Sequence, residues 1–239
     1  MQAYDADLEL FRDNFKRFMS EHIAPHYMAW EKAGIMPREV WNKLGENGFL
    51  CVDMPEEYGG YGVPTNYSLM LVEEAARAGY GALSIGMSVH SEITAPYVLH
   101  IAKKKKKKYW IPKLVSGEMV GGIAMTEPGA GSDLQAMRTS ALLTGEHYVV
   151  NGSKTFISNG QHAGLIILAA KTDPTARAKG VSLLLVDTRL DGFKKGTNLE
   201  KIGMHCQDTS ELFFDNLKVP KDQLLGNEGS GFAYLMQEL

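Results

Sequence analysis

The chain has 239 residues, 44% of them hydrophobic and 22% charged, which is the balance of an ordinary globular protein with one or two domains. Its net charge of −3 gives no general attraction to nucleic acid, and it has no apolar run of the about 18 residues that suggest a membrane span. Cys51 and Cys206 make no disulfide framework and no targeting peptide is visible, so a reducing compartment is the simplest interpretation.

The first half of the chain has the apolar spacing of α-helices. A helix is predicted over residues 5–22, where phenylalanines recur at helical spacing before a proline ends it. Further helices are predicted over residues 38–46, after Thr65, and from residue 83 to about residue 100. The last of these looks largely buried and contains His90, which we interpret as a packed, hydrogen-bonded core residue rather than a catalyst.

Six consecutive lysines, Lys103–Lys108, follow this helix. Three interpretations compete: a solvated helical turn leading into Tyr109, a patch that binds anions, and an altered segment of the sequence. Lysines at a helix N-terminus oppose the helix dipole, so local fraying is expected. We favour the solvated turn, because the run has no interleaved aromatic residues and the chain is acidic overall, which makes a nucleic-acid partner a poor fit.

After Gly121 the pattern changes from helical to β. Asn151-Gly152 between two apolar runs predicts a hairpin with a type I′ turn. Short strands at regular spacing predict a small antiparallel β-barrel or sandwich. The candidate strands are residues 139–144, 148–150, 153–157, 165–171, 181–186 and 212–214.

The fold class is therefore α+β, with a helical N-terminal domain over residues 1–118 and a β domain over residues 119–226. A glycine-rich joint precedes a third part, residues 227–239. In this part apolar residues recur at helical spacing and predict a helix face that has no partner in the chain: Phe232, Leu235, Met236 and Leu239. The sequence ends inside this predicted helix, so we expect a fragment of a longer protein.

The stretch from Gly121 to Gly160 has the composition of a ligand site. An apolar strand leads into Thr126–Asp133, where Pro128 fixes one φ angle, and Gly129 and Gly131 permit positive φ and close approach of a ligand to the backbone. Exposed N–H groups in such a loop suit an anionic or carbonyl-bearing ligand. The alternative is a β-turn before a helix start, with Ser132 or Asp133 as N-cap.

Three hydroxyl groups and one aromatic ring accompany this loop. Thr126, Ser132 and Ser158 can each donate and accept a hydrogen bond, and Phe156 adds a flat apolar face. This set suits a planar ring with polar edges and a phosphate or amide chain. It is not a dinucleotide fingerprint, because the third glycine of that motif is absent.

Two segments, Thr-Glu-Pro-Gly-Ala-Gly-Ser-Asp (126–133) and Asn-Gly-Ser-Lys-Thr-Phe-Ile-Ser-Asn-Gly (151–160), resemble the flavin-binding middle domain of the acyl-CoA dehydrogenase family. Residues 54–60, 207–212 and 224–229 extend the likeness over nearly the whole chain. Phe-Ile-Ser in place of the commoner Trp-Ile-Thr, together with Gln-Asp-Thr and the ending Met-Gln-Glu-Leu, looks most like the long-chain branch.

This resemblance implies a helical domain, a middle β domain and a C-terminal four-helix bundle, the last of which is missing here. It implies FAD bound between the last two domains, and removal of a Cα proton and a Cβ hydride from a fatty acyl-CoA. Implied partners are acyl-CoA, an electron-transfer flavoprotein and further copies of the subunit in a tetramer or dimer. The compartment would be bacterial cytoplasm or the mitochondrial matrix.

The resemblance also assigns residues. Thr126 would lie at flavin N1 and O2, Ser158 near N5, and Phe156 over one ring face, while Ser132 would contact both the cofactor and the pantetheine of the substrate. The catalytic glutamate would lie beyond Leu239, so no catalytic residue is expected here, and the fragment should be inactive. Glu127 would only tie down the loop, and no metal is implied. The full cofactor-binding set is Ile123, Met125, Thr126, Gly131, Ser132, Phe156, Ile157 and Ser158.

Two other functions remain open. A flavin-dependent monooxygenase or oxidase of the same superfamily would differ by rapid reaction of its reduced flavin with O₂. A non-catalytic flavin- or CoA-binding module would differ by the absence of bound FAD or of thioester-dependent bleaching.

Overall fold

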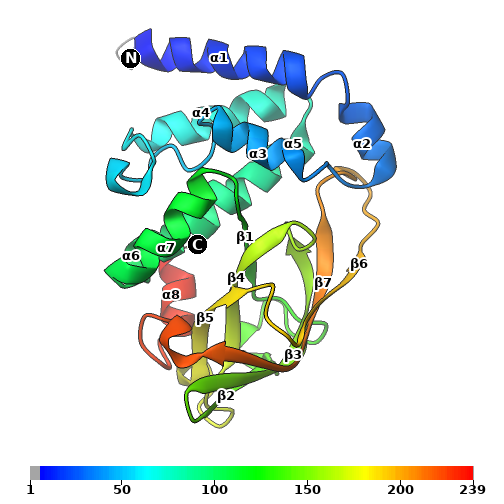
Figure 1. Cartoon of the computed structure of the whole chain (residues 1–239). Helices are drawn as coiled ribbons and strands as arrows, with labels where there is room; N and C mark the ends of the chain where they lie inside the picture. Colours follow the sequence, from blue (N-terminus) through cyan, green and yellow to red (C-terminus); the bar gives the residue numbers. More distant parts are fainter. Residues whose placement is uncertain (1–5, 239) are drawn as a thin grey trace.

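The computed structural model describes residues 6–238 and has helices in the first half of the chain and a sheet in the second, as the α+β prediction requires (Figure 1). A π-helical turn, Val89–Thr94, joins α5 to α6, so the helix predicted from residue 83 is one continuous element that begins at Gly81. α2 has no counterpart among the predicted helices. The helices of this half are α1 (Ala6–His22), α2 (Tyr27–Ala33), α3 (Glu39–Glu46), α4 (Thr65–Arg77), α5 (Gly81–Ser88), α6 (Ala95–Ile101) and α7 (Lys104–Val115).

The phenylalanines that predict α1 form part of the helical core. Phe15 and Phe18 are buried, and the rings of both pack edge-on against Phe49, with centroids 5.0 and 5.2 Å away. Trp41 and Leu44 of α3 join the same cluster. Full burial of each such side chain contributes about 1.5–3 kcal/mol. Packing of one apolar stripe per helix therefore holds α1 and α3 together.

One sheet contains the strands, in the order β6-β7-β3-β2-β4-β5-β8, with β1 paired to β4 off this path. Most pairs are antiparallel, as predicted. However, β1 runs parallel to β4, and so does a single β2–β4 residue pair, so the sheet is mixed rather than wholly antiparallel. The strands are β1 (Val120–Ala124), β2 (Ser140–Thr144), β3 (His147–Ser158), β4 (Ala163–Lys171), β5 (Val181–Asp187), β6 (Phe193–Asn198), β7 (Thr209–Pro220) and β8 (Leu224–Leu225).

The predicted Asn151-Gly152 hairpin is wrong, because both residues lie inside the continuous strand β3. The turn between β2 and β3 is instead at Gly145, whose φ is 60°. At Gly152 a Cβ atom would lie 2.5 Å from the Thr139 hydroxyl, so close approach of a neighbouring segment explains the glycine. Pairing with β7 is irregular here, since Val150 faces Leu217 and Gly152 faces Phe214.

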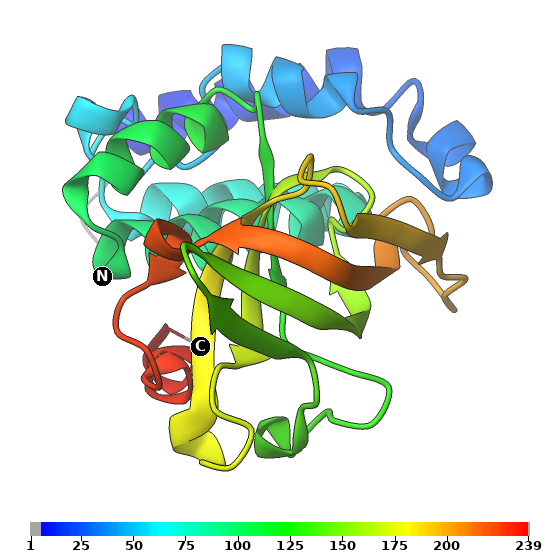
Figure 2. The same ribbon diagram turned by 60° about the horizontal axis from the view of Figure 1, so that its bottom comes forward.

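β4 is buried on both faces, which explains its unbroken apolar run. Leu165, Ile167 and Ala169 share a cluster with α6 and α7, whereas Ile166 and Leu168 belong to the cluster between the strands. Figure 2 shows the helices of the first half of the chain gathered together above and behind the strands, whereas α8, in red, lies apart from them. The helical and β parts thus share one core across the predicted boundary at residue 118.

The C-terminal helix α8 (Gly231–Glu238) lies against β5 and α6 (Figure 1). Leu235 is fully buried in the shared core, so the expectation that this helix face lacks a partner is wrong in part. Met236, in contrast, is 56% exposed, and Leu239 lies outside the described residues. The His100 Nδ1 and a Glu238 carboxylate oxygen lie 2.8 Å apart and join α6 to α8.

The lysine run forms the first turns of α7, without a side-chain cap at Lys103. The Lys106 side chain donates a hydrogen bond to the Leu224 carbonyl at 2.6 Å, and the side chains of the other five lysines make no hydrogen bond or ion pair with the described residues. This agrees with a solvated helical turn. Across residues 6–238, no helix combines the length and the apolar character that crossing a bilayer would require.

Candidate functional site

The two segments singled out from the sequence lie side by side at one edge of the β part. The Thr155 N–H donates to the Thr126 carbonyl at 3.0 Å, and the Lys154 ammonium donates to the Met125 carbonyl at 2.8 Å. Further along, a Cβ atom on Gly122 would lie 3.1 Å from the Ser158 carbonyl. The stretch that ends at Thr126 therefore runs antiparallel beside the end of β3, and these two stretches form the edge that carries Thr126 and Ser158.

A short closed turn follows β1. The main chains of Glu127 and Ala130 exchange two hydrogen bonds, of 2.9 and 3.1 Å, with Pro128 and Gly129 between them. Neither Gly129 nor Gly131 adopts the positive φ that glycine permits. A Cβ atom on either glycine would meet nothing within 4 Å, so the backbone there borders open space.

No α-helix follows this turn. Only the 3₁₀ turn Leu134–Ala136 comes after it, and the Asp133 side chain makes no capping hydrogen bond. The N-cap interpretation of Ser132 and Asp133 is therefore not supported. Ser132 is exposed, and no hydrogen bond among the described residues joins it to Phe156 or Ser158.

A buried ion pair fixes the turn onto β3. The Lys154 side chain is fully buried, and its ammonium donates to the Glu127 carboxylate at 2.9 Å. The same carboxylate accepts from the main-chain N–H groups of Arg138 (2.7 Å) and Thr139 (3.0 Å). Burial alone would raise the pKa of Glu127, but Lys154 and these donors outweigh it and hold the pKa below its ordinary value. Glu127 is therefore an ionised structural anchor, as its predicted role requires.

Phe156 protrudes from the edge in a strained conformation. Its φ is 60°, which is rare for a bulky residue, and its side chain is 66% exposed. It sits in a bulge of β3, since Lys154 faces Leu212 and Ile157 faces Ser210 across the pair with β7. The next residue, Ile157, is buried among the strands, so only its main chain could meet a ligand.

The polar groups at this edge are free to bind. Within residues 6–238 the hydroxyls of Thr126, Ser132 and Ser158 make no hydrogen bond, and neither do the N–H groups of Gly131 and Ser132. Ile123 and Met125, the remaining predicted members, are half-buried and pack against the core that faces the helices. Free donors beside an exposed aromatic ring fit a flat ligand with polar edges, and flavin is such a ligand.

Two buried polar residues that support this edge, Lys154 and Asn159, were not identified from the sequence. The sequence signal for Lys154 is a charged residue inside an apolar strand pattern, together with an acidic residue, Glu127, in the other motif. Asn159 is fully buried with a φ of 62°, and the only sequence signal for it is the Asn-Gly pair after Ser158. His90 agrees with its predicted core role: its Nε2 lies 3.0 Å from the Leu114 carbonyl, and its Nδ1 accepts from the Gly121 N–H at 2.9 Å.

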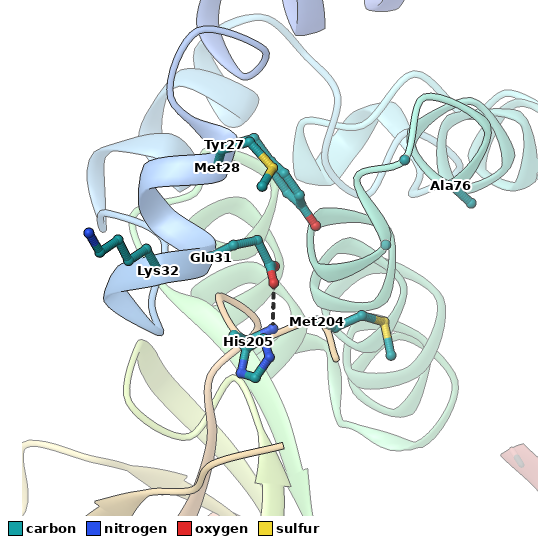
Figure 3. A pocket seen from close by; sticks show the side chains of 9 residues that line it. Tyr27, Met28, Glu31, Lys32, Ala76, Met204 and His205 are labelled. Carbon is teal, nitrogen blue, oxygen red and sulfur yellow. Dashed lines mark hydrogen bonds between the residues drawn. The ribbon is translucent and has the colours of Figure 1, made fainter. Parts of the chain in front are cut away.

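A separate hollow of about 830 Å³ lies between α2 and the segment that precedes β7 (Figure 3). Its lining shares no residue with the Thr126 and Ser158 edge. The Glu31 carboxylate in its wall accepts from the N–H groups of His205 (2.8 Å) and Cys206 (3.2 Å) and from the Cys206 thiol (2.9 Å). Glu31 thus supports the segment before β7. Residues 6–238 contain no cluster of three or more metal-binding side chains.

Both halves of this chain match domains of known proteins. Residues 5–118 match the acyl-CoA dehydrogenase N-terminal domain, and residues 122–217 match the acyl-CoA dehydrogenase middle domain. The long-chain specific acyl-CoA dehydrogenase of mouse mitochondria (Mus musculus) is 43% identical over 240 residues, which cover 100% of this chain and 55% of that protein. The chain thus spans about half the length of the curated relatives it matches.

Solved structures agree in fold. An acyl-CoA dehydrogenase from Geobacillus kaustophilus matches with a TM-score of 0.96 and 47% identity, over 99% of this chain and 62% of that one. An acyl-CoA dehydrogenase from Bacillus anthracis, complexed with FAD, matches with a TM-score of 0.91 and 29% identity, over 99% of this chain and 41% of that one. With both domains matched in order and the fold shared throughout, the chain belongs to the acyl-CoA dehydrogenase family.

Proposed function

We propose that the protein containing this chain removes hydrogen from Cα and Cβ of fatty acyl-CoA thioesters, with FAD as cofactor and long acyl chains as substrates. One observation carries the proposal: on two adjacent segments, the hydroxyls of Thr126 and Ser158 have no hydrogen-bond partner within residues 6–238, and the ring of Phe156, two residues before Ser158, is 66% exposed. The helical domain, the β domain and the start of a C-terminal domain proposed for this protein are residues 1–118, 119–226 and 227–239. Electrons would pass to an electron-transfer flavoprotein, and the subunits would form a tetramer or dimer.

The chain's own residues would bind and orient the cofactor, and FAD, when bound, supplies the hydride acceptor. Thr126 would donate a hydrogen bond to the pyrimidine rim of the ring, where negative charge develops, and a preorganised donor there stabilises the transition state. Ser158 would hold the ring near N5, and Phe156 would cover one face and exclude water. The free N–H groups of Gly131 and Ser132 suit the anionic chain of the cofactor.

Proton removal from Cα needs a base that this chain does not offer at the edge. Glu127 lies within the motif, but its carboxylate oxygens are held by Lys154, Arg138 and Thr139. Its lowered pKa also makes it a weak base. We therefore place the base beyond Leu239, and infer that residues 1–239 alone do not turn over.

The test uses the protein that carries this chain together with the C-terminal part present in its relatives. It should contain FAD, and a saturated long-chain acyl-CoA added without oxygen should bleach the flavin absorbance. Thr126→Val should slow this reduction by about 10²–10³-fold, whereas Thr126→Ser, which keeps the hydroxyl, should stay near the wild-type rate.

Loss of FAD from the wild-type protein, or FAD that no acyl-CoA reduces, would refute the proposal. Rapid reoxidation of the reduced protein by O₂ would favour an oxidase or monooxygenase instead. Equal rates in Thr126→Val and the wild type would reject the role of Thr126 while leaving the reaction standing.

A further inference from the structure

Asn159 is a fully hydrogen-bonded polar side chain at the proposed flavin edge. It is fully buried, and its Nδ2 donates to the Gly86 carbonyl of α5 at 3.0 Å and to the Gly121 carbonyl of β1 at 3.1 Å. Its Oδ1 accepts from Gln207 Nε2 at 2.9 Å. Every hydrogen-bonding atom of this amide therefore has a partner, and the three partners lie on three different elements.

The backbone of Asn159 is used as fully as its side chain. Its N–H donates to the Asp208 carbonyl at 2.9 Å, and its carbonyl accepts from the Ala163 N–H at 2.7 Å. The Gly160 N–H donates to the Ile157 carbonyl at 3.2 Å, which closes a β-turn with Ser158 and Asn159 at its two central positions. The φ of 62° at the third position suits Asn or Gly, so residue type and turn geometry agree.

This turn determines where the Ser158 hydroxyl points. Ser158 occupies the second position of this turn. Hydrogen bonds to α5, β1, β4 and the segment before β7 fix the next residue, Asn159. Phe156 lies three positions before Asn159, in the bulge whose strained φ must be held by its surroundings. Without the Asn159 amide, the end of β3 would lose its direct side-chain bonds to β1 and to α5.

We propose that Asn159 is a positioning residue that holds Ser158, and with it the end of β3, at the distance from β1 that the flavin ring requires. This inference rests on the proposed function. It assigns Asn159 no contact with substrate or cofactor: it acts through the turn. Because the same amide holds the Gly86 carbonyl, the position of α5 and the flavin edge are set together.

The test compares matched substitutions at two asparagines of the β part. Asn159→Asp keeps shape and tolerance of positive φ but points a carboxylate at two carbonyls, and Asn159→Gly keeps the backbone and removes all side-chain bonds. The controls are Asn216→Asp and Asn216→Gly, because Asn216 also has a positive φ (49°) but is exposed, in β7. All are made in the FAD-containing protein with its C-terminal part.

We expect flavin reduction at saturating acyl-CoA to fall by about 10²-fold in Asn159→Asp, with a shifted flavin midpoint potential and little change in KM. Asn159→Gly should show the same direction with a smaller loss, and both Asn216 variants should match the wild type. If Asn159→Asp does not fold, Asn159→Gly carries the test. Wild-type rate and potential in Asn159→Gly would overturn the inference.

Hydrogen exchange separates this inference from the proposed function. Amides in residues 155–160 should exchange faster in Asn159→Gly than in Asn216→Gly, whether or not FAD is present. Equal exchange rates would overturn the inference that the Asn159 side chain holds the end of β3. Absence of FAD or of acyl-CoA-dependent reduction in the wild type would instead refute the proposed function. A change in potential with unchanged FAD content would show positioning rather than general loss of structure.

Discussion

Removing the buried ammonium of Lys154 should destabilise the protein strongly. Lys154→Met keeps most of the side-chain volume but leaves the Glu127 carboxylate without its cation. Removing one partner of a buried ion pair costs about 3–5 kcal/mol, because the remaining charge stays desolvated. Here Glu127 keeps two main-chain donors, Arg138 at 2.7 Å and Thr139 at 3.0 Å, so we expect the lower end, about 3 kcal/mol.

The pH dependence of this loss has a definite sign. The depressed pKa of Glu127 stabilises the wild type above the pKa of the unfolded chain, about 4.3, and this stability is lost as the pH falls through the lower folded value. In Lys154→Met the burial remains without the cation, so the pKa of Glu127 should rise. Protonation of Glu127 then removes the unpaired buried charge. The stability that the variant loses relative to the wild type should therefore shrink as the pH falls from about 7 to about 5.

Denaturant unfolding followed by tryptophan fluorescence measures both effects. The control is Lys194→Met, because the Lys194–Asp215 pair spans 3.9 Å with side chains 69% and 65% exposed, and its loss should cost under about 0.5 kcal/mol. The double variant Glu127→Gln/Lys154→Met should lose less unfolding free energy than the two single variants lose in sum. A deficit under about 1 kcal/mol for Lys154→Met, or one that does not change with pH, would refute the reasoning.

Three further predictions follow from buried or strained positions. Gly45→Ala places a Cβ atom 2.1 Å from the Ser116 carbonyl oxygen and should cost at least about 1–3 kcal/mol in unfolding free energy, whereas Gly129→Ala meets open space and should stay within about 0.5 kcal/mol. Burial lowers the pKa of His90 to about 4, so its neutral form stabilises the protein above about pH 6.5, and that stability is lost as the pH falls toward 4. The deficit of His90→Gln, in denaturant titrations across this window, should therefore shrink by roughly 3 kcal/mol; a constant deficit would contradict the burial argument. Phe156→Asn should unfold at or above the wild-type denaturant midpoint, because it relieves the positive φ and loses a ring that is 66% exposed, yet it should slow flavin reduction. A lower midpoint would show that the ring packs more than its exposure indicates.

Much of the fold could be predicted because each element carries its own local signal. The phenylalanine spacing of α1 and the unbroken apolar run of β4 follow directly from which faces are buried. The proposed flavin edge rests on the same kind of local signal: glycines, hydroxyls and an aromatic ring within short stretches predict a site before any fold is known. His90 was assigned to the core by its place in a buried helix, which the structure confirms.

Errors arose where one residue pattern suits two environments. Asn151-Gly152 has hairpin chemistry, but the neighbouring Thr139 segment requires a glycine inside a continuous strand. The apolar face of α8 looked unpartnered, yet Leu235 enters a core built from α6 and β5, more than 40 residues earlier in the chain. In both cases the deciding neighbour is remote in sequence.

The sequence by itself determined the change from helices to strands near residue 120, the family resemblance and the candidate residues of the proposed flavin edge, since spacing and residue chemistry are local properties. Only the tertiary structure decided that β1 runs parallel to β4, that Lys154 neutralises Glu127, and that Asn159 joins α5, β1 and the segment before β7. A buried charge or amide is stable only when its partners are in place, and those partners come from segments that folding, not spacing, brings together.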